Sequence, residues 1–472
     1  MKQYTINPPR LLIAATQSGS GKTAVTSGIM AALRRRGYDV RAYKVGPDYI
    51  DPGYLSAASG RPVQNLDTWL TDRQVMTRIF AETSAAADIV FVEGVMGLYD
   101  GGKNGMSSSA EIAKILKLPV VLVIDAKSMG QSAAAIAMGF RDYDPDVSIC
   151  GVILNRLGSE NHRRMICEAF RQINIPVLGS VFRSESMLIS ERHLGLLPEQ
   201  ENSDKNRISA IADVIERSVD IGLIIEIANK SVPIKADMRS SAQAAAKVKI
   251  GIARDEAFSF YYQESFAELE RAGAELFFFS PLHDEYLPDV DGIIFGGGFP
   301  EIFAEGLSAN ESMKKNIYDA ASDGIPIYAE CGGFMYLTEY ITDFNGKRFR
   351  MSAVIPASCS MGRQLQKIGY IEARALKDTV ICRSGTVIRG HEFHFSTDEP
   401  GIEPSAFPWA FSFCRTSSGD SCMSGYASGS VLASYLHISF SGCPELVSNF
   451  VAHCLEYHNK KSIGSGLKNV EY

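Results

Sequence analysis

The chain has 472 residues, of which 46% are hydrophobic and 21% charged, so it can form more than one packed core. Its formal net charge of -7 gives no broad basic field for a nucleic-acid backbone or an anionic membrane, which favours small-molecule chemistry. The apolar run near the N-terminus is too short for a signal peptide, and no other stretch is apolar enough to cross a bilayer. The nine cysteines form no CxxC pair, which favours reduced thiols. We therefore expect a cytoplasmic protein without nucleic-acid or membrane partners.

Short apolar segments rich in β-branched residues alternate with helical or polar segments along the chain. They occupy residues 10–15, 39–45, 87–94, 118–125 and 147–155, and then 247–255, 274–281, 290–298 and 324–330. This alternation predicts parallel sheets covered by helices, so we expect an α/β protein with two doubly wound domains. The expected boundaries are a first domain at 1–228, a linker at 229–246, a second domain at 247–458 and a disordered tail at 459–472.

The segment SGSGKT lies between the first predicted strand and a helical segment. Gly19 and Gly21 let backbone N–H groups turn toward a phosphate, while Lys22 can reach the β- and γ-phosphates of a nucleotide. The Thr23 hydroxyl can ligate Mg²⁺. Thr16 stands where the strict motif has glycine, and a simple glycine-rich turn is the alternative interpretation. Because the segment connects a strand to a helix, we predict that it binds ATP.

Charged and amide side chains follow three further strands, in the segments YKVGPDYIDPGY, VFVEGVMGLYDGG and GVILNR. The carboxyl ends of parallel strands meet at one edge of a sheet, so these side chains are expected beside the phosphate loop. Carboxylates placed there can hold Mg²⁺ directly or through water, although each alone fits a turn or a helix cap. The predicted metal ligands are Thr23, Asp48, Asp51, Glu93 and Asp100, and the predicted nucleotide contacts include Lys44 and Asn155.

The second series of strands ends in the segment GIPIYAECGGFMYLTEY, which has the strand-turn-helix pattern of a nucleophile elbow with Cys331 at its apex. We expect the helix N-terminus to lower the pKa of this thiol, whereas an inert buried cysteine is the alternative. Gly297 and Gly298 follow a strand and, with Gly332, are candidates for an oxyanion hole. His437 in ASYLHISF is the candidate base.

The motifs of both predicted domains resemble those of known protein families. From SGSGKT to VEGVMGLYDG the chain resembles the ATP-dependent amidase half of the cobyrinate a,c-diamide synthases and, more distantly, dethiobiotin synthetase. The segments around Cys331 resemble the class I glutamine amidotransferase domain, which is flavodoxin-like, in its cobyrinate-synthase form. The resemblance implies that ATP and Mg²⁺ activate carboxylates of a corrinoid tetrapyrrole as acyl phosphates. Ammonia from L-glutamine, or free ammonia, then forms the a- and c-amides of cobyrinate in cobalamin biosynthesis.

Several points stay open at this stage. Many class I relatives carry glutamate two residues after the catalytic histidine, where this chain has Ser439, so the group that orients His437 is undefined. Hydrogenobyrinate and nickel-sirohydrochlorin are alternative substrates, and a homodimer is also left open. A partition-type ATPase is a different class, but Gln17 replaces the second lysine of that class. The segment RGHEFHFS also matches the family, and we expect hydrogen bonding or an interface role there rather than metal binding.

Overall fold

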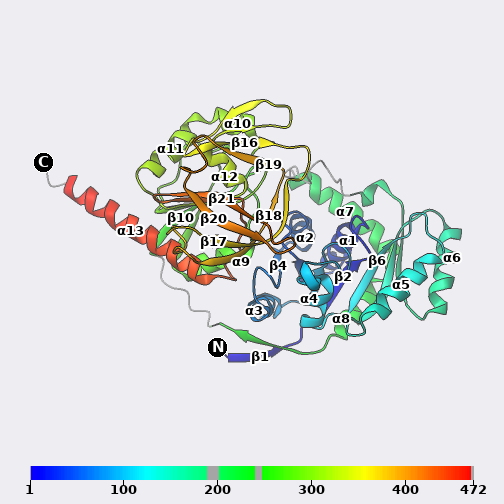
Figure 1. The fold of residues 1–472 in the computed structure, drawn as a ribbon. Helices are drawn as coiled ribbons and strands as arrows, with labels where there is room; N and C mark the ends of the chain where they lie inside the picture. Colours follow the sequence, from blue (N-terminus) through cyan, green and yellow to red (C-terminus); the bar gives the residue numbers. More distant parts are fainter. Residues whose placement is uncertain (1, 189–200, 240–246, 469–472) are drawn as a thin grey trace. The chain divides into compact units, whose positions relative to one another are not determined.

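The computed structural model describes residues 2–188, 201–239 and 247–468. The chain divides into two compact units, residues 1–240 and 241–472, each with its own α/β architecture (Figure 1). The predicted fold class is confirmed in both. Among the described residues, no helix is long and apolar enough to span a bilayer.

The N-terminal unit is built on a parallel sheet with the strand order β4-β3-β5-β2-β6-β7-β8. Its strands are β2 (Arg10–Ala15), β3 (Val40–Val45), β4 (Gln64–Leu66), β5 (Ile89–Glu93), β6 (Val120–Asp125), β7 (Ile149–Leu157) and β8 (Val177–Phe182). Its α-helices are α1 (Lys22–Arg35), α2 (Asp51–Ser59), α3 (Arg73–Ser84), α4 (Ser109–Leu116), α5 (Ser132–Tyr143), α6 (Glu160–Gln172), α7 (Glu201–Ser218) and α8 (Ile221–Asn229). Short 3₁₀ turns cover Lys103–Gly105 and Glu185–Met187.

Helices cover both faces of this sheet because its central strand is apolar on both sides. Leu11 and Ile13 of β2 pack in one cluster with residues of α1, α7 and α8. Leu12 and Ala14, which point to the opposite face, pack in a second cluster with residues of α4, α5 and α6. Strand β2 lies between β5 and β6, where the order of the strands in the sheet reverses. The loop after β2 therefore lies at this switch point. Open α/β sheets bind ligands at this place.

Part of the segment 229–246, which the sequence predicted to be a linker, forms regular structure. Residues Ile234–Met238 form β9, which pairs antiparallel with β1 (Lys2–Ile6). Ile234 is buried in the core of the N-terminal unit, which therefore extends to about residue 240. A short strand with alternating charged and apolar residues carries too weak a signal to be distinguished from a linker.

The C-terminal unit has a sheet with the order β11-β10-β12-β13-β22-β21-β20-β17-β18. The first five strands are parallel: β11 (Ala274–Phe279), β10 (Val248–Ala253), β12 (Gly292–Phe295), β13 (Ile327–Glu330) and β22 (Val431–Ser434). The remaining four continue the sheet in antiparallel fashion: β21 (Ser421–Ser428), β20 (Trp409–Arg415), β17 (Lys367–Ala375) and β18 (Val387–His394). A separate sheet contains β15 (Arg348–Arg350), β14 (Thr338–Thr342), β16 (Ile355–Met361) and β19 (Ser396–Pro400).

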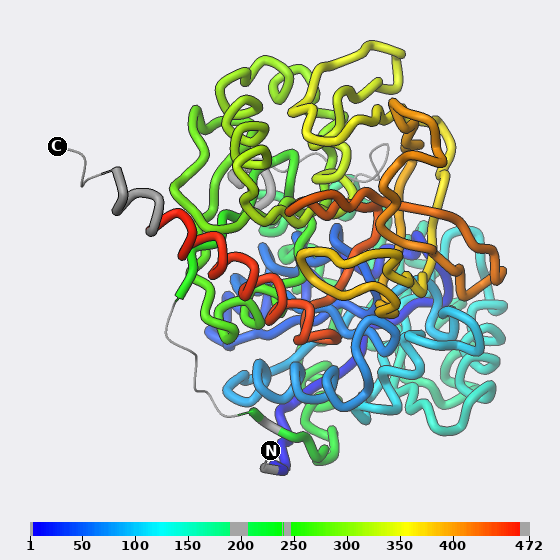
Figure 2. The backbone as a smooth tube through the Cα atoms, turned by 60° about the vertical axis from the view of Figure 1, so that its left-hand side comes forward, coloured from blue at the N-terminus to red at the C-terminus, as the bar shows by residue number. Residues whose placement is uncertain are grey.

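Helices pack against both faces of the parallel part. They are α9 (Gln263–Arg271), α10 (Ala304–Ala309), α11 (Glu311–Ser322), α12 (Gly332–Leu337) and α13 (Pro444–Lys468). Helix α13 is the red segment of Figure 2 near the C-terminus, and its apolar side packs through Leu446, Phe450 and Cys454. It continues to Lys468, whereas the sequence predicted a disordered tail from 459, and residues 469–472 lie outside the described part.

Candidate active sites

The loop between β2 and α1 has the backbone of a phosphate-binding loop. Gly19 and Gly21 have φ angles of 72° and 83°, in the left-handed region that favours glycine. A Cβ atom on Gly21 would lie 2.4 Å from Nδ2 of Asn155. That Nδ2 atom donates a hydrogen bond to the carbonyl of Ser20 at 2.9 Å, so the Asn155 amide braces the loop itself. A contact of Asn155 with the nucleotide stays a prediction.

Two side chains of the first turn of α1 point to the carboxyl end of β5. Lys22 Nζ donates to the carbonyl oxygen of Met96 at 2.8 Å, and Thr23 Oγ1 donates to Oε1 of Glu93 at 3.0 Å. Burial and the nearby Lys44 ammonium lower the pKa of Lys22. Lys22 and Thr23 line a cavity of about 350 Å³. The helix N-terminus adds its positive dipole end, so the cavity suits a phosphate group.

Lys44 lies at the centre of the predicted acidic residues. Its Nζ atom donates to Oδ2 of Asp51 at 2.5 Å and to Oε1 of Glu93 at 2.8 Å, and lies 3.7 Å from Oδ2 of Asp48. Lys44 and Glu93 are paired in the register of β3 and β5, which explains why residues far apart in sequence meet here. Burial of Lys44 lowers its pKa, but the acids outweigh that effect and raise it. Burial and the Asp51 carboxylate raise the pKa of Asp48 to about 7.

The residues present fit a magnesium ion bound together with phosphates. Glu93 Oε2 is buried and has no hydrogen-bond partner among the described residues. The other carboxylate oxygen, Oε1, accepts a hydrogen bond from the Thr23 hydroxyl. The described chain contains no group of three or more His, Cys, Asp or Glu side chains arranged to hold a metal by themselves. Mg²⁺ is commonly held by one or two carboxylates plus substrate phosphates, which matches this arrangement. Asp100 accepts the Gly97 N–H at 2.9 Å within a turn and is not among the residues that line the cavity, and its role as a metal ligand stays a prediction.

Cys331 forms a strained turn between β13 and α12 in the C-terminal unit. Its φ and ψ angles are 46° and -102°, a conformation that a residue with a side chain rarely adopts. Its N–H donates to the carbonyl oxygen of Ser434 at 2.7 Å, which fixes the turn to β22. A Cβ atom on Gly332 would lie 2.9 Å from the backbone nitrogen of Gly298, so the predicted oxyanion-hole residues come together beside the cysteine.

His437 follows β22, the strand next to β13, and is buried with 1% of its surface exposed. A Cβ atom on Gly297 would lie 2.6 Å from Cε1 of the His437 ring. On another side the ring stacks on His391, with ring centroids 4.9 Å apart, and the two backbones exchange hydrogen bonds. The structure thus collects Cys331, the three glycines and His437 at the carboxyl ends of adjacent parallel strands.

The sequence predicted a lowered pKa for the Cys331 thiol, whereas its surroundings in the structure raise that pKa. Burial raises the pKa of Cys331 far above its ordinary value, and the Glu301 carboxylate raises it further, while the Gly332 N–H lowers it less. Helix α12 has only six residues, so its dipole is weak compared with burial. The raised pKa favours the neutral thiol, so the reaction needs a base that removes its proton.

Comparisons with known proteins assign the chain to a family. Residues 11–196 match the model of the CobQ/CobB/MinD/ParA nucleotide binding domain, and residues 249–444 match that of the CobB/CobQ-like glutamine amidotransferase domain. A protein of Dehalococcoides mccartyi (strain CBDB1) named cobyrinate a,c-diamide synthase is 43% identical, over 94% of this chain and 98% of its own. The chain belongs to the cobyrinate a,c-diamide synthase family. A second relative with this name, from Syntrophotalea carbinolica, is 42% identical over the same shares.

Solved structures add nothing to this assignment. A glutamine amidotransferase structure has 16% sequence identity and a TM-score of 0.31, covering 43% of this chain and 98% of that chain. The family assignment therefore rests on the sequence relatives and the two domain matches.

The RGHEFHFS segment of this family member forms a hydrogen-bonded network. His391 contacts the Tyr262 hydroxyl through Nε2 at 2.8 Å, and Glu392 accepts a hydrogen bond from Arg415 at 3.1 Å. His394 Nε2 lies 3.5 Å from Glu392. The segment therefore takes part in structural hydrogen bonding, one of the two roles expected from the sequence, and the backbone of His391 also pairs with that of His437.

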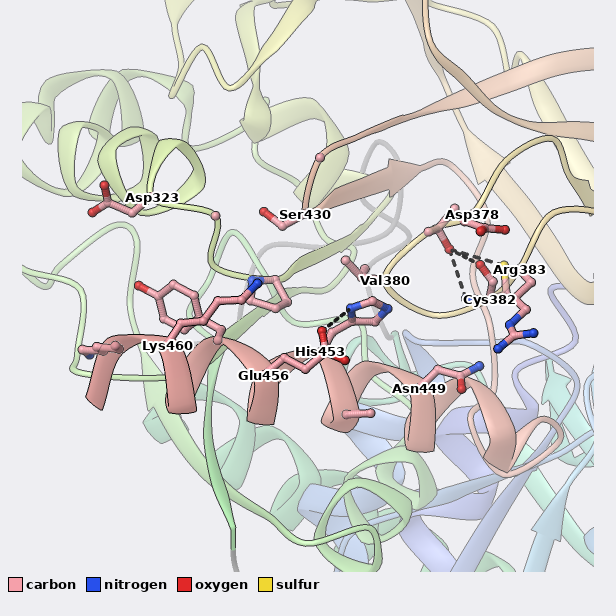
Figure 3. A pocket seen from close by; sticks show the side chains of 17 residues that line it. Asp323, Asp378, Val380, Cys382, Arg383, Ser430, Asn449, His453, Glu456 and Lys460 are labelled. Atoms are coloured by element: carbon pink, nitrogen blue, oxygen red, sulfur yellow. Dashed lines mark hydrogen bonds and ion pairs between the residues drawn. The ribbon is translucent and has the colours of Figure 1, made fainter. Parts of the chain in front are cut away.

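A cavity of about 870 Å³ in the C-terminal unit is drawn in Figure 3, and Cys331 is not among the residues that line it. It is bordered by Pro326 and Ser430, which directly precede β13 and β22, and by α13 residues such as His453 and Lys460. Cys331 and His437 follow the same two strands. The cavity therefore lies at the amino ends of these two strands, and Cys331 and His437 lie beyond their carboxyl ends.

Sequence reasoning missed Glu330, the residue before Cys331. Alternation along a strand places neighbouring side chains on opposite faces, so the strand pattern gives no signal that Glu330 lies near His437. The strained turn at 331 breaks that alternation.

Proposed function

We propose that this protein is a glutamine-dependent carbon–nitrogen ligase that converts the a and c side-chain carboxylates of cobyrinate into amides at the expense of ATP. The observation that carries the proposal is identity of 42–43% along 94% of the chain with relatives named for this reaction. Both required sets of side chains are present: the loop with Lys22 and Thr23, and the turn with Cys331 after β13, with His437 after the adjacent strand β22.

In the N-terminal unit, the proposed step is transfer of the γ-phosphoryl group of ATP to a substrate carboxylate. A carboxylate oxygen is a poor leaving group, and the acyl phosphate gives ammonia a better one to displace. Lys22 and the loop N–H groups hold the phosphates, and Lys44 donates hydrogen bonds to Asp51 and Glu93 that fix both carboxyl groups in place. Mg²⁺, held by Thr23 and Glu93, would neutralise phosphate charge when bound.

In the C-terminal unit, the proposed step releases ammonia from glutamine. His437 takes the proton of the Cys331 thiol as Sγ attacks the side-chain amide carbon, and the N–H groups of Gly298 and Gly332 hold the oxyanion. The C–N bond breaks as His437 returns the proton to the leaving nitrogen, giving ammonia and a glutamyl thioester. Water then hydrolyses the thioester to glutamate and restores the thiol.

The decisive test incubates purified protein with ATP, Mg²⁺ and glutamine, and with cobyrinate, hydrogenobyrinate or nickel-sirohydrochlorin in parallel. Mass spectrometry of the pigment should show two successive replacements of OH by NH₂ on cobyrinate. Amidation of another pigment alone would change the substrate assignment, and no amidation of any pigment would overturn the proposal.

Two variants assign the proposed steps to the two units. Cys331→Ala should abolish glutamine-dependent amidation but retain ammonia-dependent amidation, whereas Lys22→Ala should abolish both. Ammonia-dependent amidation at the normal rate in Lys22→Ala would contradict the assignment of phosphoryl transfer to the phosphate loop.

A further inference from the structure

The position that holds an orienting glutamate in many class I amidotransferases is occupied by Ser439 in this chain. A hydroxyl cannot balance the charge of an imidazolium as a carboxylate does. Another group must therefore supply that function if His437 acts as a base.

Glu330 is placed beside the His437 ring. Its Oε2 atom lies 3.4 Å from Nδ1 of His437, within ion-pair distance. Its other oxygen, Oε1, accepts hydrogen bonds from the Tyr328 hydroxyl at 2.6 Å and from the N–H of Ile438 at 3.1 Å. The carboxylate is therefore fixed at one oxygen while the second faces the imidazole.

The fold accounts for this placement. Glu330 ends β13 and is paired with Ser434 at the end of β22, three residues before His437. The Ile438 N–H that binds Glu330 belongs to the residue directly after His437, so the carboxylate holds the backbone and the ring of this segment together. Glu330 is 8% exposed, which keeps solvent from screening the interaction.

The other groups around the ring complement this arrangement. Burial and the neighbouring His437 lower the pKa of His391 well below its ordinary value, which disfavours a second positive charge beside His437. Burial and the Glu330 carboxylate raise the pKa of Tyr328, so its hydroxyl remains a donor. Glu330 is thus the acid placed to balance a positive His437.

We propose that Glu330 is a positioning residue for the glutaminase reaction, replacing the glutamate that related enzymes carry two residues after the histidine. Glu330 is positioned to accept a hydrogen bond from the Nδ1–H group of His437, which fixes the tautomer in which Nε2 has the free lone pair that receives the Cys331 proton. It also stabilises the imidazolium that forms. This inference rests on the proposed glutamine-dependent function.

The test is steady-state kinetics of full-length Glu330→Gln, a substitution that preserves side-chain size and removes the charge. We expect the kcat for glutamine-dependent amidation to fall by about 100-fold or more, with KM for glutamine changed by less than about threefold. Ammonia-dependent amidation should be unchanged. Glu268→Gln, which also removes a buried acid of the C-terminal unit, should keep its glutamine-dependent rate within about twofold of wild type.

A double-variant cycle with His437→Asn separates positioning from a general structural effect. If Glu330 acts through His437, Glu330→Gln should slow the His437→Asn protein no further, within about twofold. The inference would be overturned if the kcat losses of the two single variants multiplied in the double variant. An unchanged kcat in Glu330→Gln, or a change in KM for glutamine alone, would also overturn it.

Tyr328→Phe provides a second variant that leaves the carboxylate in place and removes one of its anchors. We expect a smaller loss of glutamine-dependent kcat, and an unchanged kcat would count against the inference if Glu330→Gln fails to fold. A wild-type protein that amidates with ammonia but never with glutamine would instead refute the proposed function of the C-terminal unit.

Discussion

Replacing Lys44 by methionine tests the charge balance of the N-terminal site. The Lys44 side chain is 1% exposed, and its ammonium group is the cationic partner of Asp51 and Glu93, the second of which is fully buried. Methionine fills most of the same volume, so the main loss is the charge and its hydrogen bonds. We expect the N-terminal unit to lose stability.

The magnitude follows from burial. Removing one partner of a buried ion pair leaves an uncompensated charge and costs about 3–5 kcal/mol. The exposed pair of Lys114 with Asp144, in which the lysine side chain is 40% exposed, provides a matched control. Lys114→Met should cost about 1 kcal/mol or less, because solvent screens that pair.

The assay uses the two tryptophans of the chain, Trp69 in the N-terminal unit and Trp409 in the C-terminal unit. In a Trp409→Phe background, Trp69 fluorescence during urea unfolding reports on the N-terminal unit, measured without metal at pH 8. A Lys44→Met protein no less stable than the Lys114→Met protein would refute the reasoning from burial.

Further predictions concern the loop and the cysteine. Gly21→Ala should weaken ATP binding at least about tenfold, because alanine is strained at this φ and its Cβ would displace Asn155. Gly37→Ala, at a similar positive φ in open space, should bind ATP normally, and equal losses would contradict the role of the contact. Glu301→Gln should speed alkylation of Cys331 by iodoacetamide at pH 8, because the carboxylate raises the thiol pKa. Burial raises the pKa of Glu301 to about 7, so its contribution to stability is present below about pH 4 and is lost as pH rises through 7. Urea unfolding followed by the C-terminal tryptophan should therefore show that Glu301→Gln reduces the stability difference between pH 5 and pH 8.

The parallel strands and the groups at their ends were predictable because both rest on local signals. Apolar strands such as β2 and β13 are short, uninterrupted and followed by glycine-rich turns, and the carboxyl-end rule then places Lys22 near Glu93. The prediction that Lys22 lies near Glu93 did not require knowledge of which strands pair. The same rule brought Cys331 and His437 to neighbouring strand ends.

Features that depend on long-range pairing or on burial were beyond the sequence. The antiparallel strands between residues 367 and 428 follow no helix-strand alternation, and their order depends on tertiary contacts. The direction of the Cys331 pKa shift depends on burial and on Glu301, which no local pattern reveals. The contact of Glu330 with His437 depends on the turn at 331 and the register of two strands.

The antiparallel pair of β1 and β9 joins the beginning and the end of the N-terminal unit. Lys2 faces Met238 and Ile6 faces Ile234, so the chain enters and leaves this unit at the same place. A unit with adjacent ends can be excised, transplanted or circularly permuted without stretching its interior. The phosphate-binding unit therefore suits expression as a separate fragment, because its first and last strands pair with each other.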